Sequence, residues 1–204
     1  MGNWVDEAVG RALEKADEYF MGIHEVQRTA DALVRRLREM RIDFAIAGAL
    51  ALQVHGVSRM TEDVDVLITR EGLERFKELW LGRGYVELRP GGKPIRDTET
   101  KVKIDFLITG DFPGDGRPKP IAFPDPRAAA VEGERYAVVV LPRFVELKLA
   151  SGMTAPDRPR DLDDVIRIIR ARGLGRDFQD ELNPYVRAKY LELWEVAHTP
   201  AGEY

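Results

Sequence analysis

The sequence predicts an α+β protein in which a small mixed sheet, with helices of its own, lies between helical segments. Three features of the 204 residues carry this prediction. Apolar residues recur every three to four positions before residue 42 and again beyond residue 142, as in amphipathic helices. Between these segments, short apolar or alternating runs separated by Gly and Pro indicate strands. We therefore expect an N-terminal helical segment, a core and a C-terminal helical region, over residues 1–42, 43–141 and 142–204.

The first part predicts two helices, over residues 4–20 and 23–40, that meet near Gly22. The core then opens with a strand over residues 44–47 and a turn at Gly48. Further strands are expected over residues 63–68, 85–88, 101–108 and 138–141. The helices expected between strands cover residues 49–55 and the segment from the N-cap Thr69 to Gly82, whose inward stripe is Leu73, Phe76, Leu79 and Trp80.

A long surface loop is expected over residues 109–120, which hold three Gly and three Pro. Beyond it and the last strand, the C-terminal part predicts helices over residues 143–150, 160–172 and 184–197.

Composition restricts the class of protein. The net charge of -4 is not the basic balance of a general nucleic-acid-binding protein, and the absence of cysteine excludes disulfides and thiolate chemistry. The longest nearly unbroken apolar run, residues 44–52, is too short to span a bilayer, which takes about 20 residues. The first twenty residues are acidic rather than basic and apolar, so no secretory signal is expected. We expect a cytoplasmic protein with no membrane partner.

Two aspartates within one predicted strand are the most informative residues. Side chains alternate along a strand, so Asp63 and Asp65 share one face while the valines between and after them face the core. Like charges so placed repel, and a bound divalent cation is the usual remedy; oxygen ligands suit Mg²⁺ or Mn²⁺. The alternative is an edge strand with two solvated aspartates.

A third aspartate repeats this setting. In the strand expected over residues 101–108, Asp105 and Lys103 lie on the polar face, and alternate residues form an apolar one. If this strand neighbours the one that carries Asp63 and Asp65, three carboxylates converge, enough to hold two metal ions.

The turn before the first short helix could bind phosphate. Gly48 lets the backbone approach a ligand closely, and the unpaired amides of a helix N-terminus attract anions. The alternative is an ordinary strand-to-helix turn. His55, at the end of the same helix, is expected to pack or cap.

These residues resemble the polymerase β-type nucleotidyltransferase superfamily, whose signature is Gly-Gly or Gly-Ser, a spacer and Asp-x-Asp. The chain is most similar to the minimal bacterial branch that includes AbiEii-type toxins, over about residues 43–172. The matching segments are Ile46-Ala47-Gly48-Ala49, Arg59-Met60-Thr61-Glu62-Asp63-Val64-Asp65, Asp105, Glu146-Leu147-Lys148 and Arg160-Asp161-Leu162-Asp163-Asp164. One residue departs from the pattern: Ala49 replaces the second Gly or Ser, so any phosphate contact there comes from backbone amides.

The resemblance implies a role for each matching residue. Asp63 and Asp65 would ligate Mg²⁺ or Mn²⁺ on the NTP, and Asp105 would ligate one metal and deprotonate the acceptor hydroxyl, with release of pyrophosphate. The residues implied in nucleotide binding are Gly48, Ala49, Arg59, Thr61, Arg160, Asp161 and Asp164. Lys148 would be a catalytic residue that neutralises phosphate charge together with Arg160, and Asp161 or Asp164 would orient these two cations. The alternative for these acids is a helix start, where the helix dipole favours them.

Several acceptors and functions stay open. The NMP could pass to an RNA end, a protein or a small molecule, including a drug bound in an acidic pocket. A catalytically silent domain of the same fold, paired with a cognate antitoxin, is the alternative from another class. We favour an RNA end, because the resemblance reaches toxins that modify RNA ends and because six arginines follow the presumed site: Arg158, Arg160, Arg167, Arg170, Arg172 and Arg176.

Overall fold

The computed structural model describes residues 24–199, and within them a seven-stranded mixed sheet is flanked by helices. This confirms the predicted α+β class. The strand order is β3-β4-β5-β2-β1-β7-β6. The strands are β1 (Phe44–Ile46), β2 (Asp63–Ile68), β3 (Tyr85–Glu87), β4 (Ile95–Asp97), β5 (Lys103–Ile108), β6 (Ala130–Glu132) and β7 (Ala137–Val139). The helix expected over residues 4–20 lies outside the described part, whereas residues 24–39 are helical.

The two six-residue strands β2 and β5 form the centre of the sheet. They run parallel and pair along their whole length, with Asp65 opposite Asp105. On its other side β2 pairs antiparallel with β1. Because β2 has a partner on each side, the edge-strand interpretation of its two aspartates is wrong.

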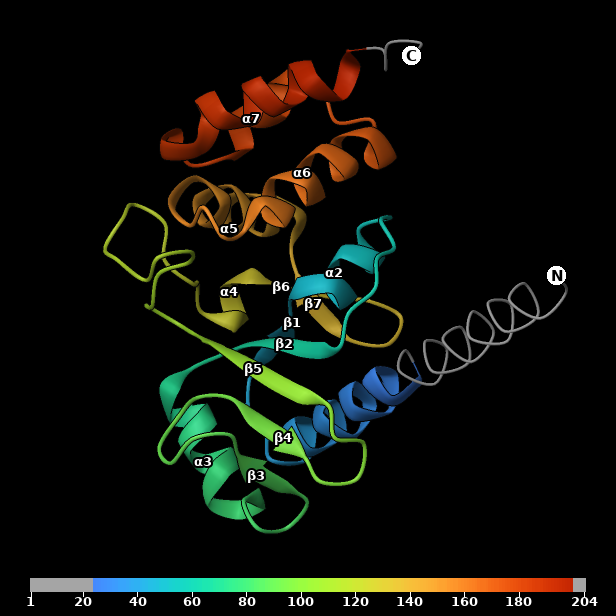
Figure 1. Cartoon of the computed structure of the whole chain (residues 1–204), viewed down its shortest axis with the longest axis vertical. Coiled ribbons are helices and arrows are strands. Elements are labelled where there is room, and N and C mark those ends of the chain that lie inside the picture. Colours follow the sequence, from blue (N-terminus) through green and yellow to red (C-terminus); the bar gives the residue numbers. More distant parts are fainter. Residues whose placement is uncertain (1–23, 200–204) are drawn as a thin grey trace, which may run out of the picture.

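Helices surround this sheet and form a separate layer at one end of the molecule (Figure 1). They are α2 (Gly48–Val54), α3 (Arg70–Trp80), α4 (Pro126–Ala129), α5 (Leu141–Thr154), α6 (Pro159–Arg172) and α7 (Pro184–His198), with a 3-10 turn at Arg176–Glu181. In Figure 1, α5, α6 and α7 stack above the sheet, whereas α3 and the helix over residues 24–39 lie at the opposite end. Among the described residues, no helix has the length and apolar content needed to cross a bilayer.

The expected helix that starts after Thr69 forms for the predicted reason. The Thr69 hydroxyl accepts the backbone N–H of Gly72, which satisfies one of the free amides of the first turn. Phe76 is fully buried and its ring packs 6.2 Å from that of Phe106, so α3 rests on the apolar face of β5. Leu79 was expected to face inward but is 42% exposed, because α3 contacts the sheet along a narrower stripe than the sequence pattern indicated.

Three short elements of the sheet region were not expected, and neither was the 3-10 turn at Arg176–Glu181. Strand β4 follows the Pro90-Gly91-Gly92 turn and pairs with β3 and β5. Helix α4 and strand β6 lie between the long loop and β7. The strand expected to extend to Leu141 ends at Val139, because Leu141 and Pro142 begin α5, where proline is tolerated at the first turn. The loop over residues 109–120 contains no helix or strand, as predicted.

Candidate active site

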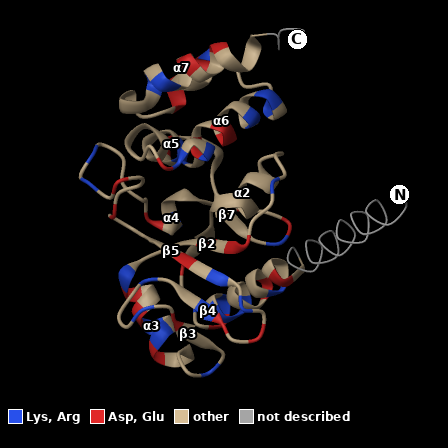
Figure 2. Ribbon diagram, in the orientation of Figure 1, with Lys and Arg blue, Asp and Glu red and all other residues tan. Residues whose placement is uncertain are grey.

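The three aspartates singled out in the sequence lie on two neighbouring strands. Asp65 is directly opposite Asp105, and Asp63 is opposite Lys103. All four side chains share one face because alternate residues of a strand point to the same side. Figure 2 shows the acidic segments of β2 and β5 beside the basic segment of β5. The adjacency of strands on which the predicted convergence depended is therefore present.

Glycine at position 48 brings the backbone against one of these carboxylates. Gly48 begins α2 with φ +54°, and a Cβ placed there would lie 1.8 Å from Asp65 Oδ2. The backbone N–H of Ala47 also donates to the carbonyl of Asp65, at 2.9 Å. A side chain at position 48 would displace the carboxylate, so the position of Asp65 depends on glycine in this turn. Ala49, the next residue, is buried.

The Asp65 carboxyl lies in an environment that disfavours its charge. Burial, followed by the negative charges of Asp63 and Asp105, raises its pKa to about 7, while Lys148 and Arg59 act in the opposite direction. Both the burial of Asp65 and the neighbouring carboxylates thus oppose its ionisation. A divalent cation bound among these oxygens would relieve that repulsion.

Two of the carboxylates already have partners within the protein. Thr61 Oγ1 donates to Asp63 Oδ1 at 2.6 Å, and Lys103 Nζ lies 2.5 Å from Asp105 Oδ2. Within residues 24–199, no three His, Asp or Glu side chains stand in positions ready to hold a metal ion. The donor chemistry and the shared face suit Mg²⁺ or Mn²⁺, although one oxygen of Asp105 is already engaged by Lys103.

A second cluster of charges joins the C-terminal helices to the loop before β2. Lys148 Nζ, on α5, lies 2.6 Å from Asp161 Oδ1 and 2.8 Å from Asp164 Oδ2, both on α6. Arg59 Nε lies 3.3 Å from Asp164 Oδ1. The Asp164 side chain is only 1% exposed and that of Lys148 11%. Lys148 and Arg59 also act to lower the pKa of Asp65, so both cations lie within electrostatic reach of that carboxyl.

Only some of the residues expected to bind phosphate belong to this second cluster of charges. Asp161 and Asp164 both hold Lys148, as the resemblance implied, although Asp161 also lies in the first turn of α6, where the helix dipole favours an acid. Arg160 is exposed, and the structure gives it no ion pair within the described residues. Lys148 and Arg59 act to lower the pKa of Asp65, whereas Lys103 contacts Asp105 directly.

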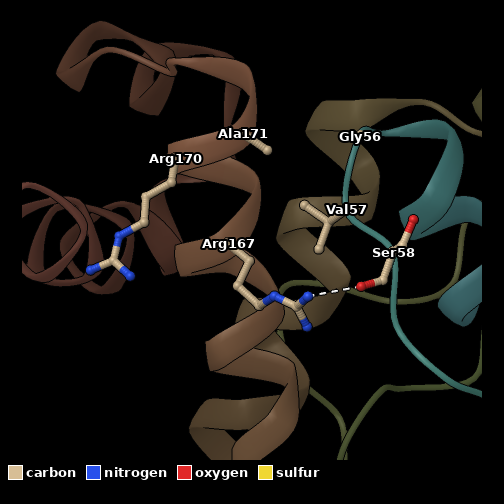
Figure 3. A pocket seen from close by; sticks show the side chains of 6 residues that line it. All are labelled: Gly56, Val57, Ser58, Arg167, Arg170 and Ala171. Atoms are coloured by element: carbon tan, nitrogen blue, oxygen red, sulfur yellow. Dashed lines mark hydrogen bonds between the residues drawn. The ribbon is translucent and has the colours of Figure 1, made fainter.

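The arginine-rich stretch is partly engaged in structural contacts. Arg167 donates to the carbonyl of Ser58 at 2.8 Å, and Arg170 donates to the carbonyls of Val196 and Ala197 at the end of α7. Figure 3 shows Arg167 directed at Ser58 across an open hollow and Arg170 directed away from it. The hollow, of about 400 Å³, is lined by Gly56, Val57, Ser58, Arg167, Arg170 and Ala171.

His55 packs within the protein, as the sequence suggested. Its Nε2 lies 2.8 Å from the carbonyl of Val139, so this nitrogen carries the proton and donates it. The ring lies 5.2 Å from that of Phe144. Burial lowers the pKa of the imidazole, and the hydrogen bond to Val139 joins the end of α2 to β7.

No protein-family profile and no curated sequence matches the chain. The antibiotic-resistance factor ANT(2'')-Ia shares its fold, with a TM-score of 0.50 and 16% identity over 84% of this chain and 98% of that one. The chain has a nucleotidyltransferase fold.

Two Helicobacter pylori proteins give weaker likenesses. JHP933 aligns with a TM-score of 0.46 and 15% identity over 90% of each chain. A protein provisionally described as a nucleotidyltransferase aligns with a TM-score of 0.45 and 15% identity, over 90% of this chain and 93% of that one.

Two features of the site escaped the sequence reasoning. Lys103 was placed on the polar face of its strand, but its contact with Asp105 was not foreseen, although spacing of two residues along a strand is the signal for it. The approach of Arg59 to Asp164 joins segments more than one hundred residues apart, and no local pattern indicates it.

Proposed function

We propose that the protein is a metal-dependent nucleotidyltransferase that moves NMP from an NTP to a hydroxyl acceptor and releases pyrophosphate. The observation that carries this proposal is the pairing of Asp65 with Asp105 across two central strands, with Asp63 on the same face and Gly48 against the Asp65 carboxylate. The resemblance of the sequence motifs and the fold shared with ANT(2'')-Ia support it.

The aspartates would act through Mg²⁺ or Mn²⁺. Asp63, Asp65 and Asp105 supply the oxygen ligands that these cations prefer. When bound, the metal neutralises the triphosphate and stabilises the attacking and leaving oxygens. Asp105 also takes the proton of the acceptor hydroxyl, so that the resulting alkoxide attacks the α-phosphorus and pyrophosphate leaves.

The remaining polar residues would hold the triphosphate. Lys148 presents its ammonium toward the aspartates while Asp161 and Asp164 hold it in place, so its charge is fixed before the phosphate arrives. Arg59 adds a second cation on the same side. The turn at Gly48 and Ala49 offers backbone amides, and Thr61 fixes the rotamer of Asp63 through its hydroxyl.

The acceptor that we favour is an RNA end. This preference depends on the resemblance to toxins that modify RNA ends and on the exposed arginines Arg158, Arg160 and Arg172, since Arg167 and Arg170 already bond to backbone carbonyls. The antibiotic-resistance role stated for ANT(2'')-Ia makes a small molecule the second candidate. A cognate antitoxin would be the partner if the protein serves as a toxin.

Incubation with each α-labelled NTP, Mg²⁺ and a cell lysate tests this function. We expect label in RNA, and none with an Asp63→Asn, Asp65→Asn double variant that is folded by circular dichroism. Label in polypeptide or a small molecule would retain nucleotidyl transfer and reject the RNA acceptor. No labelled product with any NTP, under conditions in which the nucleotide and metal bind, would favour a catalytically silent binding domain.

A further inference from the structure

Lys103 places an ammonium group against Asp105, on the face of the sheet that carries the three aspartates. It is opposite Asp63 in the register of β2 and β5, and its Nζ lies 2.5 Å from Asp105 Oδ2. Its side chain is 40% exposed and that of Asp105 25% exposed. The protein's own cation therefore contacts one of the carboxylates that a metal site would use.

We propose that Lys103 competes with the divalent cation for Asp105, so that metal binds weakly until nucleotide is present. The inference rests on the proposed function, because it assigns a positioning role toward the same metal site. An ammonium and a divalent cation cannot contact one carboxylate oxygen at close range without repelling each other. Repulsion therefore favours departure of the lysine, whose flexible stem is already partly in solvent.

Nucleotide would shift this competition toward the metal. A triphosphate brings negative charge to the face that carries Lys103, and its oxygens offer the ammonium another partner. The metal then gains both the carboxylate and the phosphate oxygens. Lys103 thus couples the binding of metal to the binding of nucleotide and keeps the empty site partly neutralised in the meantime.

Arg96 provides a matched control on the same face of the sheet. It lies opposite Lys103 in the register of β4 and β5, one strand farther from the aspartates of β2, and it is exposed. The structure gives Arg96 no ion pair with a carboxylate within residues 24–199. Removal of its charge tests the general field of the face, whereas removal of Lys103 tests the direct contact.

Calorimetric titration of Mn²⁺ into the nucleotide-free protein tests the proposal. We expect Lys103→Met to bind Mn²⁺ about fivefold more tightly than wild type, a change of about 1 kcal/mol, typical of a partly exposed ion pair. Lys103→Arg, which keeps the charge, should stay near the wild-type affinity. Arg96→Met should change it less than twofold. The increase in Mn²⁺ affinity caused by a non-hydrolysable NTP analogue should be smaller in Lys103→Met than in wild type.

Two results would overturn the inference alone. Equal or weaker Mn²⁺ binding by Lys103→Met, folded as judged by circular dichroism, would show that Lys103 does not compete with the metal. Equal tightening by Arg96→Met would assign the effect to the general charge of the face. Either result leaves the proposed function standing if Asp65→Asn still abolishes Mn²⁺ binding. Absence of Mn²⁺ binding by every protein, with and without the nucleotide analogue, would remove the metal site and the inference together.

Discussion

Replacement of Asp65 by asparagine should change how stability depends on pH in the metal-free protein. The pKa of this carboxyl is raised from 3.8 to about 7 by burial and by Asp63 and Asp105, so the folded state holds the proton more tightly than the unfolded state does. A raised carboxyl pKa gives stability that is fully present below the unfolded value and is lost as pH rises toward the folded value.

The magnitude follows from these two values. At 1.36 kcal/mol per pH unit, the carboxyl accounts for a loss of at most about 3 kcal/mol between pH 5 and pH 8. The side chain is partly exposed, and solvent screening reduces the expected loss to about 1–2 kcal/mol. Asp65→Asn keeps the shape of the side chain and removes the charge, so this part of the pH dependence should vanish.

Urea unfolding in EDTA at pH 5, 6, 7 and 8 measures the effect. Wild type should lose stability relative to Asp65→Asn as the pH rises, so that the variant is the more stable protein at pH 8. Asp163→Asn, at an exposed aspartate of α6, is the matched control and should follow the wild-type curve. Parallel curves for wild type and Asp65→Asn would refute the reasoning, because they would mean that Asp65 ionises as easily in the folded protein as in the unfolded chain.

Three further substitutions test other contacts of the site. Gly48→Ala should lower the free energy of unfolding by about 1–3 kcal/mol and weaken nucleotide binding, since its Cβ would overlap Asp65 Oδ2; urea unfolding that matches wild type would contradict this. Lys148→Met should abolish transfer and lower the free energy of unfolding by about 2–4 kcal/mol, because the buried Asp164 loses an ion-pair partner. A calorimetric melting temperature equal to that of wild type would show that the ion pair with Lys148 does not stabilise the fold. Because burial lowers the pKa of His55, wild type should lose stability as the pH falls through 6.5, and His55→Phe should not. Urea unfolding of both proteins at pH 5.5 and 7.5 measures this difference.

Local pattern was enough to predict the strands that carry the aspartates. In β2, alternating polar and apolar residues gave both ends of the strand and the face of each side chain. In β5 they gave the faces and the C-terminal end, but the strand begins at Lys103 rather than at Lys101, whose φ is +64°. Thr69 likewise predicted the start of α3 through its side-chain cap. Strand β4 was missed because three residues carry too little periodicity, and pairing with β3 and β5 defines it instead.

The parts of the site that depend on contacts between distant segments were harder to predict from the sequence. Alternation placed Asp65 and Asp105 on polar faces, but only the sheet order shows that their strands are neighbours. The burial of Asp164 beneath Lys148 and Arg59 depends on the packing of α5 and α6 against the loop before β2. The helix-start pattern of α6 could not show which of its acids turns inward.

Titration of Mg²⁺ with and without a non-hydrolysable NTP analogue tests the central claim most directly. If Asp63, Asp65 and Asp105 form a metal site for nucleotidyl transfer, calorimetry should detect Mg²⁺ binding that nucleotide strengthens in wild type. The Asp63→Asn, Asp65→Asn double variant, folded as judged by circular dichroism, should show none. Identical Mg²⁺ binding by the double variant and wild type would contradict the account, because these aspartates would then not be the ligands.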